Sequence, residues 1–226
     1  MSDSGKAHAG LEADSYRRVL DVILSGRLVP GMIVRERPLA AELGVSRTPL
    51  RQALGRLESE GFLVRQDRVV QVRRIDLPTV MEIYQLRILL EVEAIGHATG
   101  KIEQATLGRF HTIFSALSGD PADDGAVSAG MKFDRADDAF HLAIAEAGGN
   151  RTLRDYVADL RRKTQLFGVT QMPLRRDPGV AEHLAILEAL GREDKEAAQH
   201  AMTNHLERAR NSIIDRFQGL RNALST

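Results

Sequence analysis

Four side chains in the second half of the chain have the types and spacing of a metal site. Asp137 and His141 are four residues apart, so they share the apolar face of one expected helix, and His183 and His205 each lie on the apolar face of another. Inward polar groups without partners cost several kcal/mol. A divalent ion would satisfy all four groups at once, and a carboxylate with neutral imidazoles suits Zn or Ni.

Each histidine taken singly has a simpler interpretation, because a lone inward histidine is more often a hydrogen-bonded core residue than a ligand. His200 points away from the apolar stripe of its helix, and His97 lies at the border of its own. The chain contains no cysteine. Disulfides, thiolate metal sites and a thiol nucleophile are therefore excluded, and any metal must be held by nitrogen and oxygen.

Two further groups of cations could bind an anion. Arg87 shares an inward helical stripe with Glu91, and a buried arginine pairs bidentately with a carboxylate, either that of Glu91 or that of a bound acid. Pairing with Glu91 is favoured. The run from Arg161 to Lys163 covers most of a helix circumference, so a mostly solvated surface is expected there.

These residues lie in a part of the chain that shows no strand-like alternation. Apolar periodicity predicts helices near residues 78–98, 103–118, 131–147, 150–167, 178–190 and 194–223. They predict an antiparallel helical bundle. The segment 119–130 is rich in Gly, Asp and Pro without the acid spacing of a calcium loop, so a plain connector is expected.

The first part of the chain predicts a different fold, a winged helix-turn-helix of three helices and a β-hairpin wing. The expected helices cover residues 15–25, 37–43 and 46–60, and the hairpin covers residues 62–72. Gly44 ends the second helix and Ser46 caps the third. One face of the third helix is aliphatic, whereas Arg47, Thr48 and Arg51 share another, which suits a DNA major groove.

Charge is distributed unequally between the two parts. The whole chain has 31 basic and 31 acidic residues, for a formal charge of zero. Residues 15–75 hold twelve Arg and no Lys against six acids, a net charge of +6, whereas residues 77–226 carry a net charge of −3. A basic unit joined to an acidic one favours an anionic partner for the first unit, despite the zero total.

The first part resembles the winged-helix domain of the GntR family of bacterial transcriptional regulators. The resemblance rests on Pro30-Gly31, Glu36-Arg37, Leu39-Ala40, Leu43 to Arg51, Ala53-Leu54, Leu57, Gly61 and Leu63. It implies operator DNA contacts at Arg37, Ser46, Arg47, Thr48 and Arg51.

The chain departs from the family pattern at two positions. Gln52 stands where Glu is usual, and Val69 stands in the wing where glycine is usual. We therefore expect Arg65 and Arg68 to grip DNA phosphate in place of a close approach by the wing tip.

The second part resembles the metal-binding version of the FCD effector domain of the FadR-like subfamily. The matching features are Asp137-x2-Phe140-His141, Glu182-His183, His205, Arg87-x3-Glu91 and Gly148-Gly149-Asn150. The resemblance implies that Asp137 and the three histidines hold a divalent metal, Zn or Ni, which leaves positions open to a small carboxylate effector. Arg87 and Asn150 are the residues it suggests for effector contacts.

Together these features predict three segments: a disordered tail at residues 1–12, the winged helix at 13–75, and an all-helical domain for effector binding and dimerisation at 76–226. The expected protein is a homodimeric, ligand-responsive repressor on operator DNA, with no enzyme activity. No run spans a bilayer and no targeting signal is recognised, so a cytoplasmic, nucleoid-associated protein is expected. The alternatives are a metal-dependent hydrolase, a metal-free acyl-CoA-sensing regulator, and an architectural DNA protein without an effector.

Overall fold

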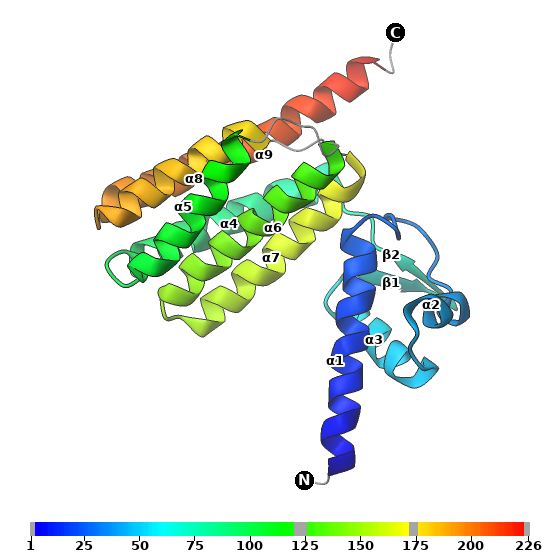
Figure 1. The fold of residues 1–226 in the computed structure, drawn as a ribbon. Coiled ribbons are helices and arrows are strands. Elements are labelled where there is room, and N and C mark those ends of the chain that lie inside the picture. Colours follow the sequence, from blue (N-terminus) through cyan, green and yellow to red (C-terminus); the bar gives the residue numbers. More distant parts are fainter. Residues whose placement is uncertain (1–2, 120–125, 172–175, 224–226) are drawn as a thin grey trace. The chain divides into compact units, whose positions relative to one another are not determined.

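The computed structural model describes residues 3–119, 126–171 and 176–223. By its internal contacts the chain divides into two units, one of Met1–Asp76 with Arg162–Gln171 and one of Leu77–Arg161 with Met172–Thr226. Both are mostly helical, and the described residues include one two-stranded sheet (Figure 1). The fold class predicted from the sequence is confirmed.

The first unit is the expected winged helix-turn-helix. Its elements are α1 (Asp3–Leu24), α2 (Glu36–Leu43), α3 (Arg47–Ser59), β1 (Leu63–Gln66) and β2 (Val69–Val72). The two strands are antiparallel, with Gln66 opposite Val69. Asp67 and Arg68 therefore form a two-residue turn, in which Asp67 has a φ of 55°.

The apolar faces of α1 and α3 form the core of this unit. Leu50 and Leu57 of α3 and Val19 and Ile23 of α1 are all fully buried, as the helical spacing predicts. Helix α1 begins at Asp3, within the segment expected as a tail. The segment before residue 14 contains alanine, leucine and glutamate and no proline, so nothing in it stops a helix.

The turn between α2 and α3 follows the expected chemistry in part. Gly44 has a φ of 63°, the left-handed conformation, and its N–H donates to carbonyls at the end of α2. Ser46 occupies the N-cap position of α3 with an extended backbone, but its side chain makes no capping hydrogen bond. Its exposed hydroxyl is thus not engaged by the helix.

The second unit is a helical bundle. Its helices are α4 (Leu77–Ala98), α5 (Gln104–Gly119), α6 (Ala126–Ala147), α7 (Arg151–Gln171, whose last ten residues group with the first unit), α8 (Arg176–Gly191) and α9 (Lys195–Ala223). Five of them close a ring: α4 packs on α9, α9 on α8, α8 on α5, α5 on α6, and α6 on α4 (Figure 1). The start of α7 packs beside α4 and α6 through Leu153 and Val157.

Helix α6 begins earlier than expected. The sequence pattern predicts a connector over residues 119–130, but the structure is helical from Ala126, because alanine, valine and serine there are compatible with a helix. The rest of that segment, residues 120–125, lies outside the described residues.

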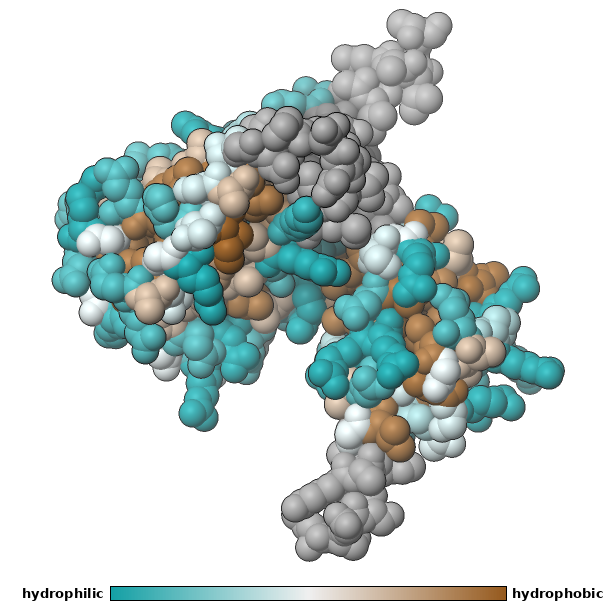
Figure 2. Space-filling view, viewed as in Figure 1, coloured by the Kyte–Doolittle hydropathy of each residue, from teal (hydrophilic) through white to brown (hydrophobic). Residues whose placement is uncertain are grey.

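Aromatic and aliphatic side chains fill the ring. Phe114 and Phe140 are fully buried and meet edge to face, with ring centroids 5.4 Å apart. In the view of Figure 2, hydrophilic residues cover much of the described surface and hydrophobic ones form scattered patches. Within the described residues, no helix combines the length and apolarity that crossing a membrane requires.

Two glycines of the first unit should respond in opposite directions to the same substitution. Gly44→Ala forces a Cβ into the left-handed region and should lower the free energy of unfolding by about 1–2 kcal/mol. Gly55 lies within α3 with open space where a Cβ would go, so Gly55→Ala should raise it by about 0.5–1 kcal/mol. Urea denaturation of both variants measures the difference, and equal signs would contradict the assigned backbone.

Candidate metal centre and nucleic-acid interface

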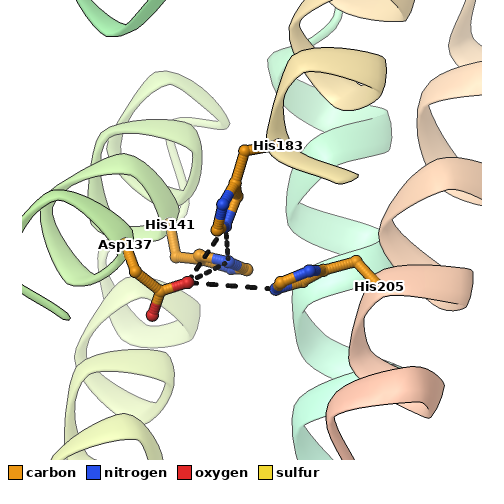
Figure 3. A group of neighbouring side chains, drawn as sticks. All are labelled: Asp137, His141, His183 and His205. Atoms are coloured by element: carbon orange, nitrogen blue, oxygen red, sulfur yellow. Dashed lines mark hydrogen bonds and ion pairs between the residues drawn. The ribbon is translucent and has the colours of Figure 1, made fainter. Parts of the chain in front are cut away.

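The structure brings together the four side chains that the sequence singled out. Asp137 and His141 project from α6, His183 from α8 and His205 from α9, and they converge on one point (Figure 3). One potential ligand atom from each lies within 4.8 Å of the others. Asp137 and His141 lie together because residues four apart on a helix share one face. The packing of α8 and α9 in the ring places His183 and His205 beside them.

The distances inside this cluster fit a single ion. Asp137 Oδ1 lies 3.0 Å from the Nε2 atom of His183, 3.6 Å from that of His141 and 3.9 Å from that of His205. The Nε2 atoms of His141 and His183 are 3.4 Å apart. Ligands about 2.0–2.2 Å from one zinc ion are separated by roughly 3–4 Å, so small side-chain shifts would complete the coordination.

Burial favours the neutral form of two of the imidazoles, those of His183 and His205. The side chains of His141 and His183 are fully buried, and that of His205 is 6% exposed. Burial lowers the pKa of His205 to about 3, although the hydrogen bond to Glu182 acts in the opposite direction. Burial also lowers the pKa of His183. Neutral imidazole is the form that ligates a metal.

Two glutamates that the sequence analysis did not assign to the cluster hold two of its histidines. Glu91 of α4 accepts a hydrogen bond from Nδ1 of His141. Glu182 of α8 accepts one from Nδ1 of His205 at 2.9 Å. In the sequence, Glu182 lies next to the expected ligand His183, and Glu91 lies on an inward helical stripe. Neither position predicts the contact, because residue spacing does not give the distance between helices.

Arg87 pairs with Glu91, which is the partner that the sequence pattern favoured. Its Nε donates to Glu91 Oε1 at 2.7 Å, and both side chains are buried. Burial alone would raise the pKa of Glu91, but the charge of Arg87, followed by the interactions of His141 and Arg161, holds this pKa well below its usual range. Glu91 is therefore ionised and can only accept hydrogen bonds.

Arg161 is the residue for which the sequence interpretation is wrong. It does not lie on a solvated surface: its side chain is 3% exposed, and it donates to Asp137 Oδ2 and, at 2.8 Å, to Asp138 Oδ1. Its Nη1 lies 3.6 Å from Glu91 Oε2. Spacing held a usable signal, because Arg161 follows the buried Val157 by four residues.

Arg161 also sets the charge of the carboxylate in the cluster. Burial would raise the pKa of Asp137, but the nearby guanidinium of Arg161, followed by the interactions with His141 and His183, lowers it well below the usual value. Asp137 is thus held as the anion that a divalent cation requires.

Asn150 has a structural partner at the start of α7. Its Oδ1 accepts a hydrogen bond from the Leu153 backbone N–H at 3.0 Å, which caps the helix. Arg161, which reaches the cluster, lies eleven residues further on, or roughly 16 Å along the helix axis. The side chain of Asn150 therefore acts at the N-terminal end of α7, whereas Arg161 lies in the middle of this helix.

The seven residues expected to contact DNA are all exposed in the first unit. They are Arg37, Ser46, Arg47, Thr48, Arg51, Arg65 and Arg68. Arg51 Nε donates to Glu36 at 2.7 Å, and Arg65 donates to Glu58 at 2.9 Å. Exposed ion pairs of this kind stabilise a protein by about 0–1 kcal/mol, so both arginines can leave their glutamate partners at little cost.

Comparisons with known proteins cover both units. The family described as "Bacterial regulatory proteins, gntR family" matches residues 11–70, and the one described as "FCD domain" matches residues 82–208. The "Nta operon transcriptional regulator" of Aminobacter aminovorans is 29% identical over 84% of this chain and 88% of its own length. The "Probable D-xylose utilization operon transcriptional repressor" of Paenarthrobacter nicotinovorans is 30% identical over 81% of this chain and 80% of its own.

A solved structure supports the fold. The chain titled "E. coli McbR/YncC" matches with a TM-score of 0.78, over 92% of this chain and 98% of that one. The sequence identity is 22%, so the likeness concerns the fold alone.

We expect the contribution of His205 to the free energy of unfolding of the metal-free protein to fall as the pH is lowered from about 6.5 to about 4.5. Histidine in an unfolded chain titrates near a pKa of about 6.5, whereas burial lowers the pKa of His205 to about 3. In this window the unfolded chain binds a proton that the folded chain excludes, so up to about 1.4 kcal/mol is lost per pH unit for each such group.

Urea denaturation with a chelator present, repeated at several pH values, measures this dependence. His205→Gln should flatten it, whereas the control His200→Gln, on the exposed side of α9, should keep the slope of the unsubstituted protein. Identical slopes for all three proteins would show that His205 is not buried in its neutral form.

Proposed function

The chain belongs to the GntR family of bacterial transcriptional regulators, with an FCD domain, and we propose that it is a metal-containing, ligand-responsive repressor. The observation that carries the sensor part of this proposal is the convergence of Asp137 with three buried histidines. The family and its relatives are transcriptional regulators, so the hydrolase alternative is wrong.

The DNA-binding part of the proposal assigns sequence reading to α3. Arg47, Thr48 and Arg51 are exposed on its first turns, while its opposite face is buried against α1. A guanidinium in the major groove can pair bidentately with guanine. Arg37 and Ser46 would position the helix on the backbone, and Arg65 with Arg68 would grip phosphate beside the wing.

The sensor part assigns Asp137, His141, His183 and His205 as ligands of zinc or nickel. When bound, the ion would supply Lewis acidity and further coordination positions for a small carboxylate. Arg87 and Asn150 remain the proposed effector contacts. Because each already has a protein partner, a bound acid would have to share or displace that partner.

We propose a homodimer because an operator of two half-sites needs two recognition helices. The large apolar side chains exposed on the described second unit support a contact between copies. They are Leu86 and Leu89 on α4, at 49% and 68% exposure, and Tyr156 on α7, at 60%. In this proposal, residues 13–75 bind DNA, residues 76–226 dimerise and sense the acid, and the protein acts on the nucleoid in the cytoplasm.

Regulation requires only that the acid bind one DNA-binding state of the dimer better than the other. The coupling free energy is then reciprocal: DNA also changes the affinity for the acid by the same factor.

Substitutions on α3 and in the wing should affect DNA binding differently. Arg51→Ala should weaken binding to an operator selected from random DNA by about 1–3 kcal/mol and relax its base preference. Arg68→Ala should weaken all DNA about equally and lower the slope of affinity against salt by about one unit. Fluorescence anisotropy across a salt series measures both.

The control for these variants is Arg109→Ala, an exposed arginine of α5 in the second unit, which should leave DNA affinity unchanged. If the double variant Arg47→Ala, Arg51→Ala bound the operator as tightly as the unsubstituted protein, α3 would not be the reading helix.

Metal and acid binding should be measurable separately. Elemental analysis of the purified protein should find about one divalent ion per chain, and zinc added after chelation should raise Tm. His183→Ala should lose both effects and His200→Ala neither. Acetate, L-lactate and citrate titrated onto zinc-loaded protein should include at least one acid that shifts operator affinity.

Absence of metal would favour the metal-free acyl-CoA-sensing alternative. Metal with no shift from any small acid would favour the architectural alternative.

A further inference from the structure

The hydrogen bonds around the cluster determine which nitrogen of two histidines faces its centre. Glu182 Oε2 lies 2.9 Å from Nδ1 of His205, and Glu91 Oε2 bonds Nδ1 of His141. An ionised carboxylate has no proton to donate, so in a neutral ring the proton must sit on Nδ1. The Nε2 atoms of both rings then carry lone pairs.

Those lone pairs point at another acceptor. Nε2 of His141 and Nε2 of His205 lie 3.6 Å and 3.9 Å from Asp137 Oδ1, and a neutral ring with its proton on Nδ1 has none to place in that gap. Only His183, whose Nε2 is 3.0 Å from that oxygen, can donate to it. Converging lone pairs repel one another in a buried site, and a cation between them removes the repulsion.

The third histidine is held in another way. His183 Nδ1 is buried and has no hydrogen-bond partner among the described residues. Its ring stacks on Phe114, with centroids 4.4 Å apart and planes at 10°, and stands edge-on to Phe140 at 5.3 Å. On its Nδ1 side, packing and not a carboxylate therefore orients this ring.

We propose that Glu91 and Glu182 are positioning residues of the metal site, each holding the Nδ1 proton of one histidine so that His141 and His205 are presented as Nε2 ligands, whereas His183 depends on its aromatic stack. This inference rests on the proposed metal site and adds residues outside the four ligands. The two glutamates belong to different helices, α4 and α8, so the ring of packed helices supplies this outer layer from two sides.

The supports of the two glutamates differ. Glu91 is fixed through its other oxygen by Arg87 at 2.7 Å, and Arg161 lies 3.6 Å from the oxygen that bonds His141. Glu182 has Arg208 at 3.5 Å, and the side chain of Arg208 is 64% exposed. The arginine 3.5 Å from Glu182 is exposed, whereas those at Glu91 are buried, so Glu182 is the first of the two to test.

The first experiment compares Glu182→Leu and Glu182→Gln. We expect Glu182→Leu to weaken zinc binding by about 10- to 100-fold, measured by competition with a chromophoric chelator. Glu182→Gln keeps an acceptor oxygen and should recover part of that loss. Glu188→Leu, at an exposed glutamate of the same helix, is the matched control and should bind zinc as the unsubstituted protein does.

The second readout is the position of the ring proton on each histidine, which would not change if Glu182 only stabilised the fold. Two-bond ¹H–¹⁵N correlation spectra of the metal-free protein should show His141 and His205 with the proton on Nδ1. In Glu182→Leu, His205 should change to a mixture of tautomers while His141 stays unchanged.

Glu91 is tested together with its buried arginine. Arg87→Met, Glu91→Gln removes both charges of the pair, which avoids a lone buried cation. This double variant should change the tautomer of His141, leave that of His205 intact and weaken zinc binding. Glu93→Gln is its control, because Glu93 bonds His97 on the exposed side of the same helix.

The outcomes separate this inference from the proposed function. If the unsubstituted protein binds no zinc, the metal site is wrong and the inference falls with it. If it binds zinc through the four ligands, but Glu182→Leu keeps both its zinc affinity and the Nδ1 proton of His205, the positioning role alone is overturned.

Discussion

Buried charge is the constraint on which the helical unit depends. Arg87 and Arg161 are removed from water together with Glu91, and each ion would cost several kcal/mol without a partner. Their pairings join α4, α6 and α7, since Arg161 also reaches Asp137 on α6. A shift of any of these helices would leave a buried charge without its partner, so the ion pairs specify which helix faces lie together. The aromatic core supplies the apolar burial.

The same pairings prepare the cluster for chemistry that the core residues could not provide. They hold Asp137 as an anion, while burial lowers the pKa of His183 and His205, so that one carboxylate and three ring nitrogens meet at distances suited to one ion. Helices from three parts of the sequence contribute these groups. A site of this kind can influence the whole bundle, because each ligand is part of the packing between helices.

The winged-helix unit uses charge in the opposite way. Arg51 and Arg65 form ion pairs with Glu36 and Glu58 at the surface, where water and salt weaken the attraction. Breaking either pair therefore costs little free energy. The aliphatic core beneath them, in which Leu57 is fully buried, holds α3 in place while its outer side chains stay available. The chain therefore buries charged pairs inside the helical bundle and carries weakly held ion pairs on the surface of the winged-helix unit.

The sequence by itself determined the helices, their inward faces and the residue types of the site, because these follow from local periodicity: the pair Asp137 and His141 on one turn of helix is an example. Helix ends were less certain, as the early start of α6 shows, since helix formers without a clear cap do not mark a boundary. Only the tertiary structure decided that Arg161 is buried and that Glu182 meets His205. Both depend on distances between helices far apart in the chain, which arise from packing and from the need to pair every buried charge, and not from the spacing of residues along one helix.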